Sequence, residues 1–275
     1  MRVHAILGSR KRLLKSPRFG TSIRDRARPD IDRVRHPAEP EEGAIAGPSD
    51  SPASTPPAGV LFDFDGTCVR GDTMAGFLVH CAARMPWRAP PMLLSWLLLA
   101  PLGLLPGGQR WVNSALTWWG TVGLGRRGTL RLVRDYAGLL RTRTDLWYPG
   151  ALCRMAEHRA RGERVWVVSA SCRQWIGPVL AAAGQGDAVL VGSVFAFRWG
   201  GLVMARRCHG AGKVLALERR DRGATRRWTW AYGDRLSDLP ILRLAERQGL
   251  VGPGRQAARA RARLGASAEV LDWRR

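Results

Sequence analysis

The sequence predicts an α/β fold, a parallel sheet covered by helices, with a further helical unit inserted after the first strand. Two observations lead to this prediction. Short apolar runs bounded by Pro or Gly alternate with helical patterns along residues 59–252, which is the order expected when crossover helices join parallel strands. In addition, about 100 residues separate the first two runs, far more than one crossover connection needs.

The predicted strands are short and mostly apolar, as expected for strands that are buried on both faces. Parallel strands are predicted at residues 60–64, 165–168, 228–232 and 250–251. Helical patterns lie between them, over residues 175–183 and 214–220. The alternation is broken once, because the runs 189–198 and 202–205 flank a Gly-Gly pair and predict a β-hairpin.

The inserted segment, residues 73–149, is expected to form a helical cap. It holds six of the twelve Trp residues, and residues 89–109 carry no charged side chain. A membrane-spanning helix needs about 20 apolar residues, whereas a proline and a glycine interrupt this stretch. We therefore expect either a buried helix pair or an interfacial or re-entrant membrane hairpin, flanked by Arg84, Arg88 and Arg110.

Composition defines the two ends of the chain. Residues 1–58 are rich in Pro and basic side chains without a sustained apolar period, and they are predicted to be a disordered extension. Residues 253–275 are predicted to be a basic helix or tail. The net charge is +22, but only three of the 44 cationic residues are lysine. This arginine bias reflects composition more than a phosphate-binding surface, so we do not expect nucleic acid as a partner.

Cysteine usage indicates the compartment. The five cysteines are scattered, odd in number and form no C-x-x-C pair, so neither a disulfide framework nor a zinc site is indicated. Charged residues interrupt the start before an apolar core of useful length could form a secretory signal. We expect a cytoplasmic protein, located at the cytoplasmic face of the inner membrane if the cap contacts lipid.

Polar residues follow three of the predicted strands. Asp63 and Asp65 end the first, Ser169 follows the second, and Asp234 and Asp238 follow the third. Because strand ends converge in an open α/β sheet, these side chains are expected to meet at one edge. Crowded carboxylates repel one another unless a cation is present, and hard oxygen ligands suit Mg²⁺. The sequence therefore predicts a magnesium site there.

Lys213 is the only lysine after residue 58, in a chain that otherwise uses arginine. A compact ammonium can lie between a carboxylate and a phosphoryl oxygen in a pocket too tight for a planar guanidinium. Gly210 and Gly212 indicate a close-packed loop that enters a helix. We predict that Lys213 belongs to the site, whereas His209 is expected to pack within the loop.

These motifs, in this order, resemble those of the haloacid dehalogenase superfamily of phosphohydrolases. Ser169-Ala-Ser171 and Gly233-Asp-Arg-Leu-Ser-Asp238 are similar to its phosphoserine-phosphatase-like branch, subfamily IB. The resemblance covers about residues 59–252. It implies a Rossmann-like core made of residues 59–72 and 150–252, with the inserted segment as its cap.

The resemblance also implies roles for the residues nearest the phosphoryl group. Asp63 would be the nucleophile that forms an aspartyl-phosphate, and Asp65 the general acid and later the general base. Ser169 would donate a hydrogen bond to the phosphoryl group, together with backbone N–H groups around Phe64 and Ala170.

A second set of implied roles concerns charge. Lys213 would stabilise the nucleophile and the phosphoryl group. Mg²⁺ would be held by Asp63, the Asp65 carbonyl and Asp234, while Asp238 would hold Lys213 or a metal-bound water.

Residues 108–111, 118–120 and 207–218 are most similar to the phosphatidylglycerophosphatase C group. This implies a lipid-linked phosphomonoester such as phosphatidylglycerophosphate, with Arg110 and Gly210 as substrate contacts, and peripheral contact with an anionic membrane. Two alternatives stay open. One is a soluble small-molecule phosphatase, of the phosphoserine type. The other is a basic nucleic-acid-binding or membrane-binding protein whose phosphatase core is vestigial.

Overall fold

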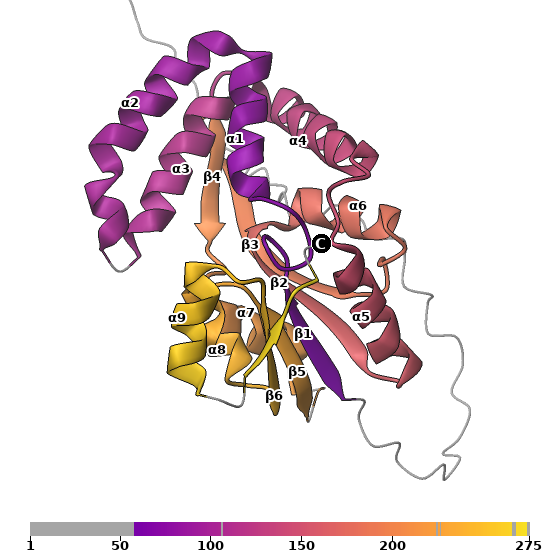
Figure 1. The fold of residues 1–275 in the computed structure, drawn as a ribbon. Helices are drawn as coiled ribbons and strands as arrows, with labels where there is room; N and C mark the ends of the chain where they lie inside the picture. The colour runs from indigo at the N-terminus through magenta and orange to yellow at the C-terminus, as the bar shows by residue number, and fades with distance from the viewer. Residues whose placement is uncertain (1–57, 106, 224, 226, 266–267, 274–275) are drawn as a thin grey trace, which may run out of the picture. The chain divides into compact units, whose positions relative to one another are not determined.

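The computed structural model describes residues 58–105, 107–223, 225, 227–265 and 268–273. The predicted extension at residues 1–58 lies outside the described residues, apart from Ala58. The described residues form a seven-stranded sheet with helices on both faces, in the order β4-β3-β2-β1-β5-β6-β7 (Figure 1). The predicted α/β fold is therefore confirmed.

Every neighbouring pair of strands is parallel except β3 and β4, which form the predicted hairpin. Each of the four predicted parallel strands is present. The strands are β1 (Gly59–Asp63), β2 (Arg164–Cys172), β3 (Val189–Arg198), β4 (Gly201–Arg206), β5 (Trp228–Gly233), β6 (Arg247–Val251) and β7 (Glu269–Leu271).

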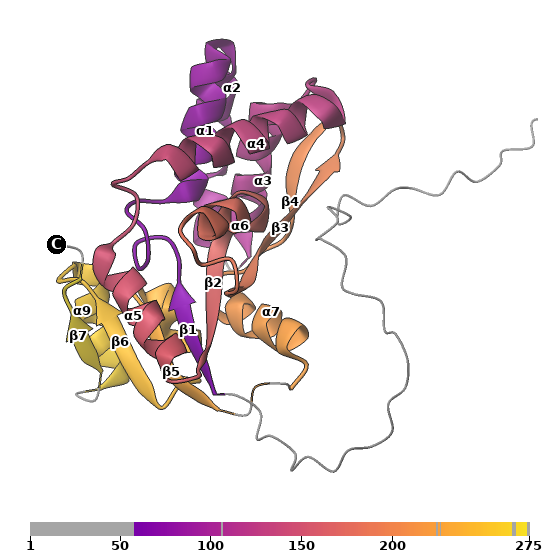
Figure 2. The same cartoon turned by 90° about the vertical axis from the view of Figure 1, so that its right-hand side faces the viewer.

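Helices fill the long insertion between β1 and β2, lead from it into β2, and also connect the later strands. Those within the insertion are α1 (Thr73–Arg84), α2 (Ala89–Leu99), α3 (Gly108–Thr121) and α4 (Gly125–Thr142), with short 3₁₀ turns η1 (Pro86–Arg88) and η2 (Pro101–Leu104). The others are α5 (Pro149–Ala160), α6 (Arg173–Ala182), α7 (Ala211–Asp221), η3 (Leu236–Asp238), α8 (Leu239–Leu242) and α9 (Arg255–Leu264). Figure 2 shows α1–α4 beyond the carboxyl ends of the strands, with the β3–β4 hairpin reaching up beside them.

Alternating side chains of the central strands build a core on each face of the sheet. Val60 and Phe62 of β1 pack with residues of α5 and α6. Leu61, between them, packs on the opposite face with residues of α7 and α8. Because both faces are covered, β1 is buried along its whole length. Its carboxyl end lies at the edge of the sheet that faces α1–α4 (Figure 2).

The C-terminal segment adds a strand that the sequence analysis did not predict. Strand β7 pairs with β6, and Trp273, two residues beyond its end, is buried against Phe62 and Tyr232. The Trp273 indole N–H donates to the Thr67 carbonyl over 2.9 Å. This contact joins the end of the chain to the loop that follows β1.

Helix α3 lies along the edge strand β4 and satisfies part of its exposed backbone. The Leu202 and Met204 N–H groups donate to the hydroxyls of Thr121 and Ser114, over 2.7 and 3.2 Å. Arg110, predicted as a substrate contact, donates through Nε to the Met204 carbonyl over 3.2 Å. The cap is thus tied to the hairpin by hydrogen bonds.

Helix α2 is apolar but largely uncovered. Its one fully buried residue, Met92, packs against Val112 and Leu116 of α3, whereas Leu94 and Leu98 are 57% and 70% exposed. The predicted alternative of a buried helix pair does not agree with these exposures, because among the described residues α2 packs mainly against α3 and leaves its other side uncovered. In the described part of the chain, no helix combines the length and apolarity required to cross a bilayer.

Candidate active site

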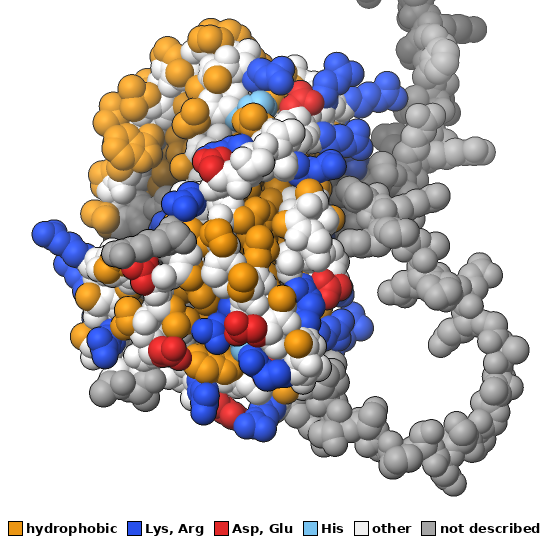
Figure 3. All heavy atoms as spheres, turned by 45° about the vertical axis from the view of Figure 1, so that its right-hand side comes forward, with side chains coloured by type: hydrophobic (Ala, Val, Ile, Leu, Met, Phe, Trp, Pro, Cys, Tyr) orange, Lys and Arg blue, Asp and Glu red, His pale blue; other side chains and the backbone are white. Residues whose placement is uncertain are grey.

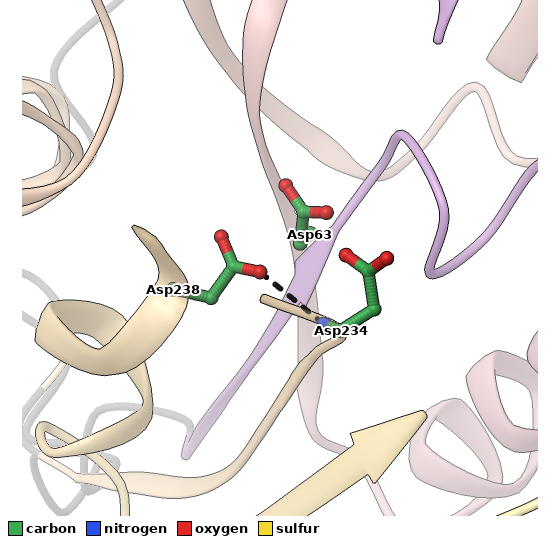
Figure 4. Close-up of side chains that lie close together, drawn as sticks. All are labelled: Asp63, Asp234 and Asp238. Atoms are coloured by element: carbon green, nitrogen blue, oxygen red, sulfur yellow. Dashed lines mark hydrogen bonds between the residues drawn. The ribbon is translucent and has the colours of Figure 1, made fainter. Parts of the chain in front are cut away.

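Three carboxylates from separate segments meet at the carboxyl end of the sheet. Asp63 ends β1, Asp234 follows β5, and Asp238 closes the turn η3. All three are buried, and one oxygen from each lies within 4.8 Å of the others. Figure 4 shows the three side chains converging on the same small volume. The sheet topology produces this cluster, because β1 and β5 are parallel neighbours that end side by side.

Lys213 lies in the first turn of α7 and bridges two of these carboxylates. Its ammonium lies 2.5 Å from Asp63 Oδ1 and 2.7 Å from Asp238 Oδ1, and its side chain is 1% exposed. Burial by itself would lower the pKa of Lys213, but Asp238 and Asp63 outweigh that effect and raise it. The lysine therefore stays charged.

Negative charge exceeds positive charge around Asp63. Burial raises the pKa of Asp63 well above its usual range, Asp238 and Asp234 raise it further, and Lys213 only partly opposes them. Three carboxylates face only two cations, the Lys213 ammonium and the Arg235 guanidinium 3.4 Å from Asp234 Oδ2, which leaves an excess of anionic oxygen in a dry site. A further cation would relieve this excess and keep Asp63 ionised.

The donor set and its surroundings fit Mg²⁺, which prefers carboxylate and carbonyl oxygens. Gly66, with φ +85°, brings the backbone so close that a Cβ atom there would lie 2.5 Å from Asp234 Oδ2. Asp238 already uses both its oxygens, since Oδ1 holds Lys213 and Oδ2 accepts from the Asp234 and Arg235 N–H groups. Asp63 is likewise held by Lys213 and the Thr67 hydroxyl, so all three carboxylates remain candidate side-chain ligands.

Asp65 connects the site to the cap. Its Oδ1 accepts a 2.7 Å hydrogen bond from the Thr73 N–H at the start of α1, and its Oδ2 accepts one from the Ser169 hydroxyl over 3.1 Å. Burial raises the pKa of Asp65, and the Thr73 backbone hydrogen bond opposes this only in part. A carboxyl that keeps its proton at higher pH is suited to act as an acid.

A cavity of about 640 Å³ separates these carboxylates from the cap. Asp63, Asp65 and Lys213 form part of its wall on one side, and α1, α2 and α3 contribute residues such as Leu78 and Trp96 on the other. The wall is thus charged near the strand ends and partly apolar under the cap.

The predicted phosphate-binding residues occupy different positions around this cavity. Ala170 lines it. Ser169 is fully buried and does not line it, and the Phe64 ring is buried against Trp147. Neither Gly210, which precedes α7 with φ +57°, nor Arg110 is part of the wall.

Other residues of the wall were not predicted from sequence. They include Ser171, Arg207 and Arg235, and also His209, which was expected to pack within its loop. Each lies inside a recognised motif or within two residues of one. This proximity is the only sequence feature that could have identified them as cavity residues. Sequence does not reveal which side chains in such a loop turn toward the cavity.

Comparison with known proteins identifies a matching family. A family model of haloacid dehalogenase-like hydrolases matches residues 60–243 of this chain. The matched stretch contains the three clustered carboxylates and Lys213.

Several solved structures share the fold at low sequence identity. A protein of unknown function from Bordetella pertussis Tohama I has a TM-score of 0.60 and 18% identity, covering 80% of this chain and 100% of that one. A phosphoserine phosphohydrolase-like protein from Francisella tularensis has a TM-score of 0.51 and 13% identity, covering 78% and 94%. Cytosolic 5′-nucleotidase IIIB bound to cytidine has a TM-score of 0.52 and 14% identity, covering 78% and 79%.

Proposed function

This chain belongs to the haloacid dehalogenase-like hydrolase family, and from that premise we propose that it hydrolyses phosphomonoesters through an aspartyl-phosphate on Asp63. One observation carries the proposal: the buried ammonium of Lys213 contacts Asp63 and Asp238, with Asp234 beside them. A nucleophilic carboxylate with a fixed cation next to it suits phosphoryl transfer, which depends on positioning and charge stabilisation.

In this proposal an Asp63 oxygen attacks phosphorus, and the bond from phosphorus to the leaving oxygen breaks. Asp65 gives its proton to that leaving oxygen. Asp65, now ionised, then takes a proton from the water that attacks phosphorus in the aspartyl-phosphate. The bond from phosphorus to the Asp63 oxygen breaks, which releases inorganic phosphate and restores Asp63. Lys213 and the Thr67 hydroxyl, 3.2 Å from Asp63 Oδ2, hold the carboxylate of the nucleophile in one orientation.

The chain's own residues also offer a place for Mg²⁺. We propose that the carboxylates of Asp63 and Asp234, with the Asp65 carbonyl, would hold it. Bound there, the ion would neutralise part of the negative charge on the phosphoryl group. Asp238 serves as a positioning residue, because its two oxygens hold Lys213 and the backbone that carries Asp234.

Replacing the nucleophile tests the reaction. Asp63→Asn should abolish Mg²⁺-dependent phosphate release from p-nitrophenyl phosphate, while Asp145→Asn, at an exposed position, should keep wild-type turnover. Both variants are compared with and without a chelator, and their folding is checked by thermal unfolding. Wild-type turnover by a folded Asp63→Asn protein would refute the proposed chemistry.

We further propose a lipid-linked phosphomonoester as the substrate, as in the phosphatidylglycerophosphatase C group. The support is the continuity between the cavity and the exposed apolar surface of α2. Trp96 belongs to both, since it lines the cavity and is 49% exposed. Hydrophobic side chains gather at the upper left of Figure 3, over α2. A lipid could therefore present its phosphate to Asp63 while its chains stay near α2.

A soluble substrate is the competing possibility, favoured by the charged part of the cavity wall. Phosphate release from phosphatidylglycerophosphate in mixed micelles, compared with release from phosphoserine, separates the two. Preference for phosphoserine at matched concentrations would exclude the lipid assignment but leave the aspartyl-phosphate chemistry intact.

A further inference from the structure

Arg207 is a cation in the cavity wall for which no described residue provides a partner. It directly follows β4 and is half-buried. Lys213 contacts two carboxylates, and Arg235 lies 3.4 Å from an oxygen of Asp234. Among the described residues, none accepts a hydrogen bond from the Arg207 guanidinium or forms an ion pair with it.

This arrangement leaves positive charge available inside the cavity. Burial lowers the pKa of Arg207, and no carboxylate opposes that effect, yet a guanidinium remains charged in proteins. A partly desolvated charge without a counter-ion is unfavourable, and an anion that entered the cavity would relieve this cost.

The backbone that carries Arg207 is held in place. The N–H of the neighbouring Cys208, whose side chain is buried, donates to the Ser193 hydroxyl over 2.9 Å. That hydroxyl in turn donates to the carbonyl of Ala170 over 2.6 Å. The Arg207 carbonyl also lies so close to Gly212 that a Cβ there would be 2.9 Å away. An anion would therefore meet a cation whose backbone is already positioned.

His209 lines the same cavity two residues later. Burial, followed by the positive charges of Arg207 and Lys213, lowers the pKa of His209 to about 4. The imidazole is therefore neutral near pH 7, and a neutral imidazole has one N–H to donate. It can contribute a hydrogen bond to an anion without a further desolvated charge.

We propose that Arg207 and His209 form a subsite for a second anionic group, carried by the leaving group of the phosphomonoester. The inference rests on the proposed function and narrows its substrate class. A phosphodiester in a lipid headgroup and the carboxylate of a phosphorylated amino acid both meet this requirement, because each carries a negative charge and accepts hydrogen bonds. A leaving group without an anion would not use this subsite.

Substrate pairs test the subsite. The wild-type protein, Arg207→Gln and Arg207→Lys are assayed with Mg²⁺ on p-nitrophenyl phosphate, phosphoserine and dihexanoyl phosphatidylglycerophosphate. For the substrate whose anion occupies the subsite, Arg207→Gln should lower kcat/KM by about 10- to 100-fold more than it does for p-nitrophenyl phosphate. Arg207→Lys should restore part of the loss, because it keeps the charge. Arg206→Gln, on the exposed neighbour, is the matched control.

A binding measurement separates this inference from the catalytic proposal. Phosphoserine and dihexanoyl phosphatidylglycerophosphate are titrated calorimetrically into Asp63→Asn with and without Arg207→Gln. A 10- to 100-fold weaker Kd in the double variant supports the subsite even if the wild-type protein releases no phosphate, a result that would refute only the proposed function. The subsite would be overturned if the single and the double variant had equal Kd values, or if neither compound bound. It would also be overturned if Arg207→Gln lowered kcat/KM equally on all three substrates.

Discussion

At the scale of single residues, the site uses a lysine where the rest of the described chain uses arginine. Lys213 is almost completely enclosed, and its ammonium contacts two carboxylates at 2.5 and 2.7 Å. A guanidinium is larger and planar, so it cannot occupy the same point between Asp63 and Asp238 without displacing one of them. The identity of this cation is therefore fixed by space as well as by charge.

Lys213→Arg should reduce kcat on p-nitrophenyl phosphate by at least about 100-fold, because the displaced charge no longer stabilises the nucleophile and the phosphoryl group. Arg219→Lys, the reverse exchange at an exposed position of the same helix, should leave kcat within about twofold. Circular dichroism verifies that both proteins fold. A Lys213→Arg enzyme with a kcat close to wild type would show that only charge matters.

Substitutions at two glycines, Gly66 and Gly71, can test how much the close approach of the backbone to Asp234 matters. Gly66 and Gly71 have φ of +85° and +82°, so alanine is strained at either position. A Cβ on Gly66 would lie 2.5 Å from Asp234 Oδ2, whereas a Cβ on Gly71 would meet nothing within 4 Å. The two substitutions thus share backbone strain and differ in the steric clash at the proposed metal site.

Gly71→Ala should lower the free energy of unfolding by about 1 kcal/mol and keep its Mg²⁺ dependence. Gly66→Ala should lower it further and raise the Mg²⁺ concentration for half-maximal phosphate release by about tenfold or more, because Asp234 must move. Urea unfolding and Mg²⁺ titration measure these effects. If both variants needed the same Mg²⁺ concentration for half-maximal phosphate release, the close approach of Gly66 to Asp234 would not matter for the metal site.

Local sequence was sufficient to find residues that follow strands, and insufficient for residues placed by tertiary packing. Asp63, Asp234 and Asp238 each follow a recognisable apolar run, so the sheet topology brings them together. Arg110 was expected at the substrate; it donates to a backbone carbonyl at the sheet edge and is not among the residues that line the cavity. Arg207 was missed because its direction depends on a loop packed against β3.

At the scale of elements, a buried histidine joins α5 to the central strand β5 of the sheet. His158 donates or accepts through both ring nitrogens, 2.5 Å from Glu163 Oε2 and 2.8 Å from the Tyr232 hydroxyl. Thr229 of β5 donates to the other oxygen of Glu163. The cluster therefore connects α5, the turn directly before β2, and β5.

This cluster predicts a loss of stability in mild acid. Burial lowers the pKa of His158, although Glu163 opposes the effect. Below about pH 6.5 the unfolded chain binds a proton that the folded imidazole does not, so the free energy of unfolding should fall as the pH decreases. His158→Gln should flatten the dependence between pH 7.5 and 5.5 by up to about 1 kcal/mol per pH unit. The free energies of unfolding are measured by urea denaturation at several pH values in this range. An equal dependence on pH in the wild-type protein and in His158→Gln would contradict the prediction.

The elements themselves were predictable to different degrees. The buried strands have apolar runs long enough to recognise, and the Gly-Gly pair marked the hairpin. Strand β7 has only three residues, and it exists because β6 offers a free edge and Trp273 fills the space beside Gly150, where a Cβ would lie 2.1 Å from Trp273 Cβ. Such long-range contacts leave no local pattern in the sequence.

At the scale of the whole molecule, an exposed apolar helix occurs in a strongly basic chain. The net charge is +22, and most apolar residues of α2, among them Leu94 and Leu98, are exposed. Basic charge attracts an anionic bilayer over several ångströms, and apolar side chains then contribute through burial in the interface. Together they predict binding to vesicles that depends on both lipid charge and salt.

The protein should therefore sediment with phosphatidylglycerol vesicles, more weakly with phosphatidylcholine vesicles, and less as salt increases. Leu94→Glu/Leu98→Glu should weaken the binding at least about tenfold, because two leucines no longer enter the interface. Its turnover of p-nitrophenyl phosphate should persist, since neither residue lines the cavity. Leu215→Glu, at a position of α7 that is 53% exposed, controls for added negative charge. If the double variant sediments like the wild-type protein, α2 is not the membrane-binding surface, and the proposed access of lipid to Asp63 past Trp96 fails with it.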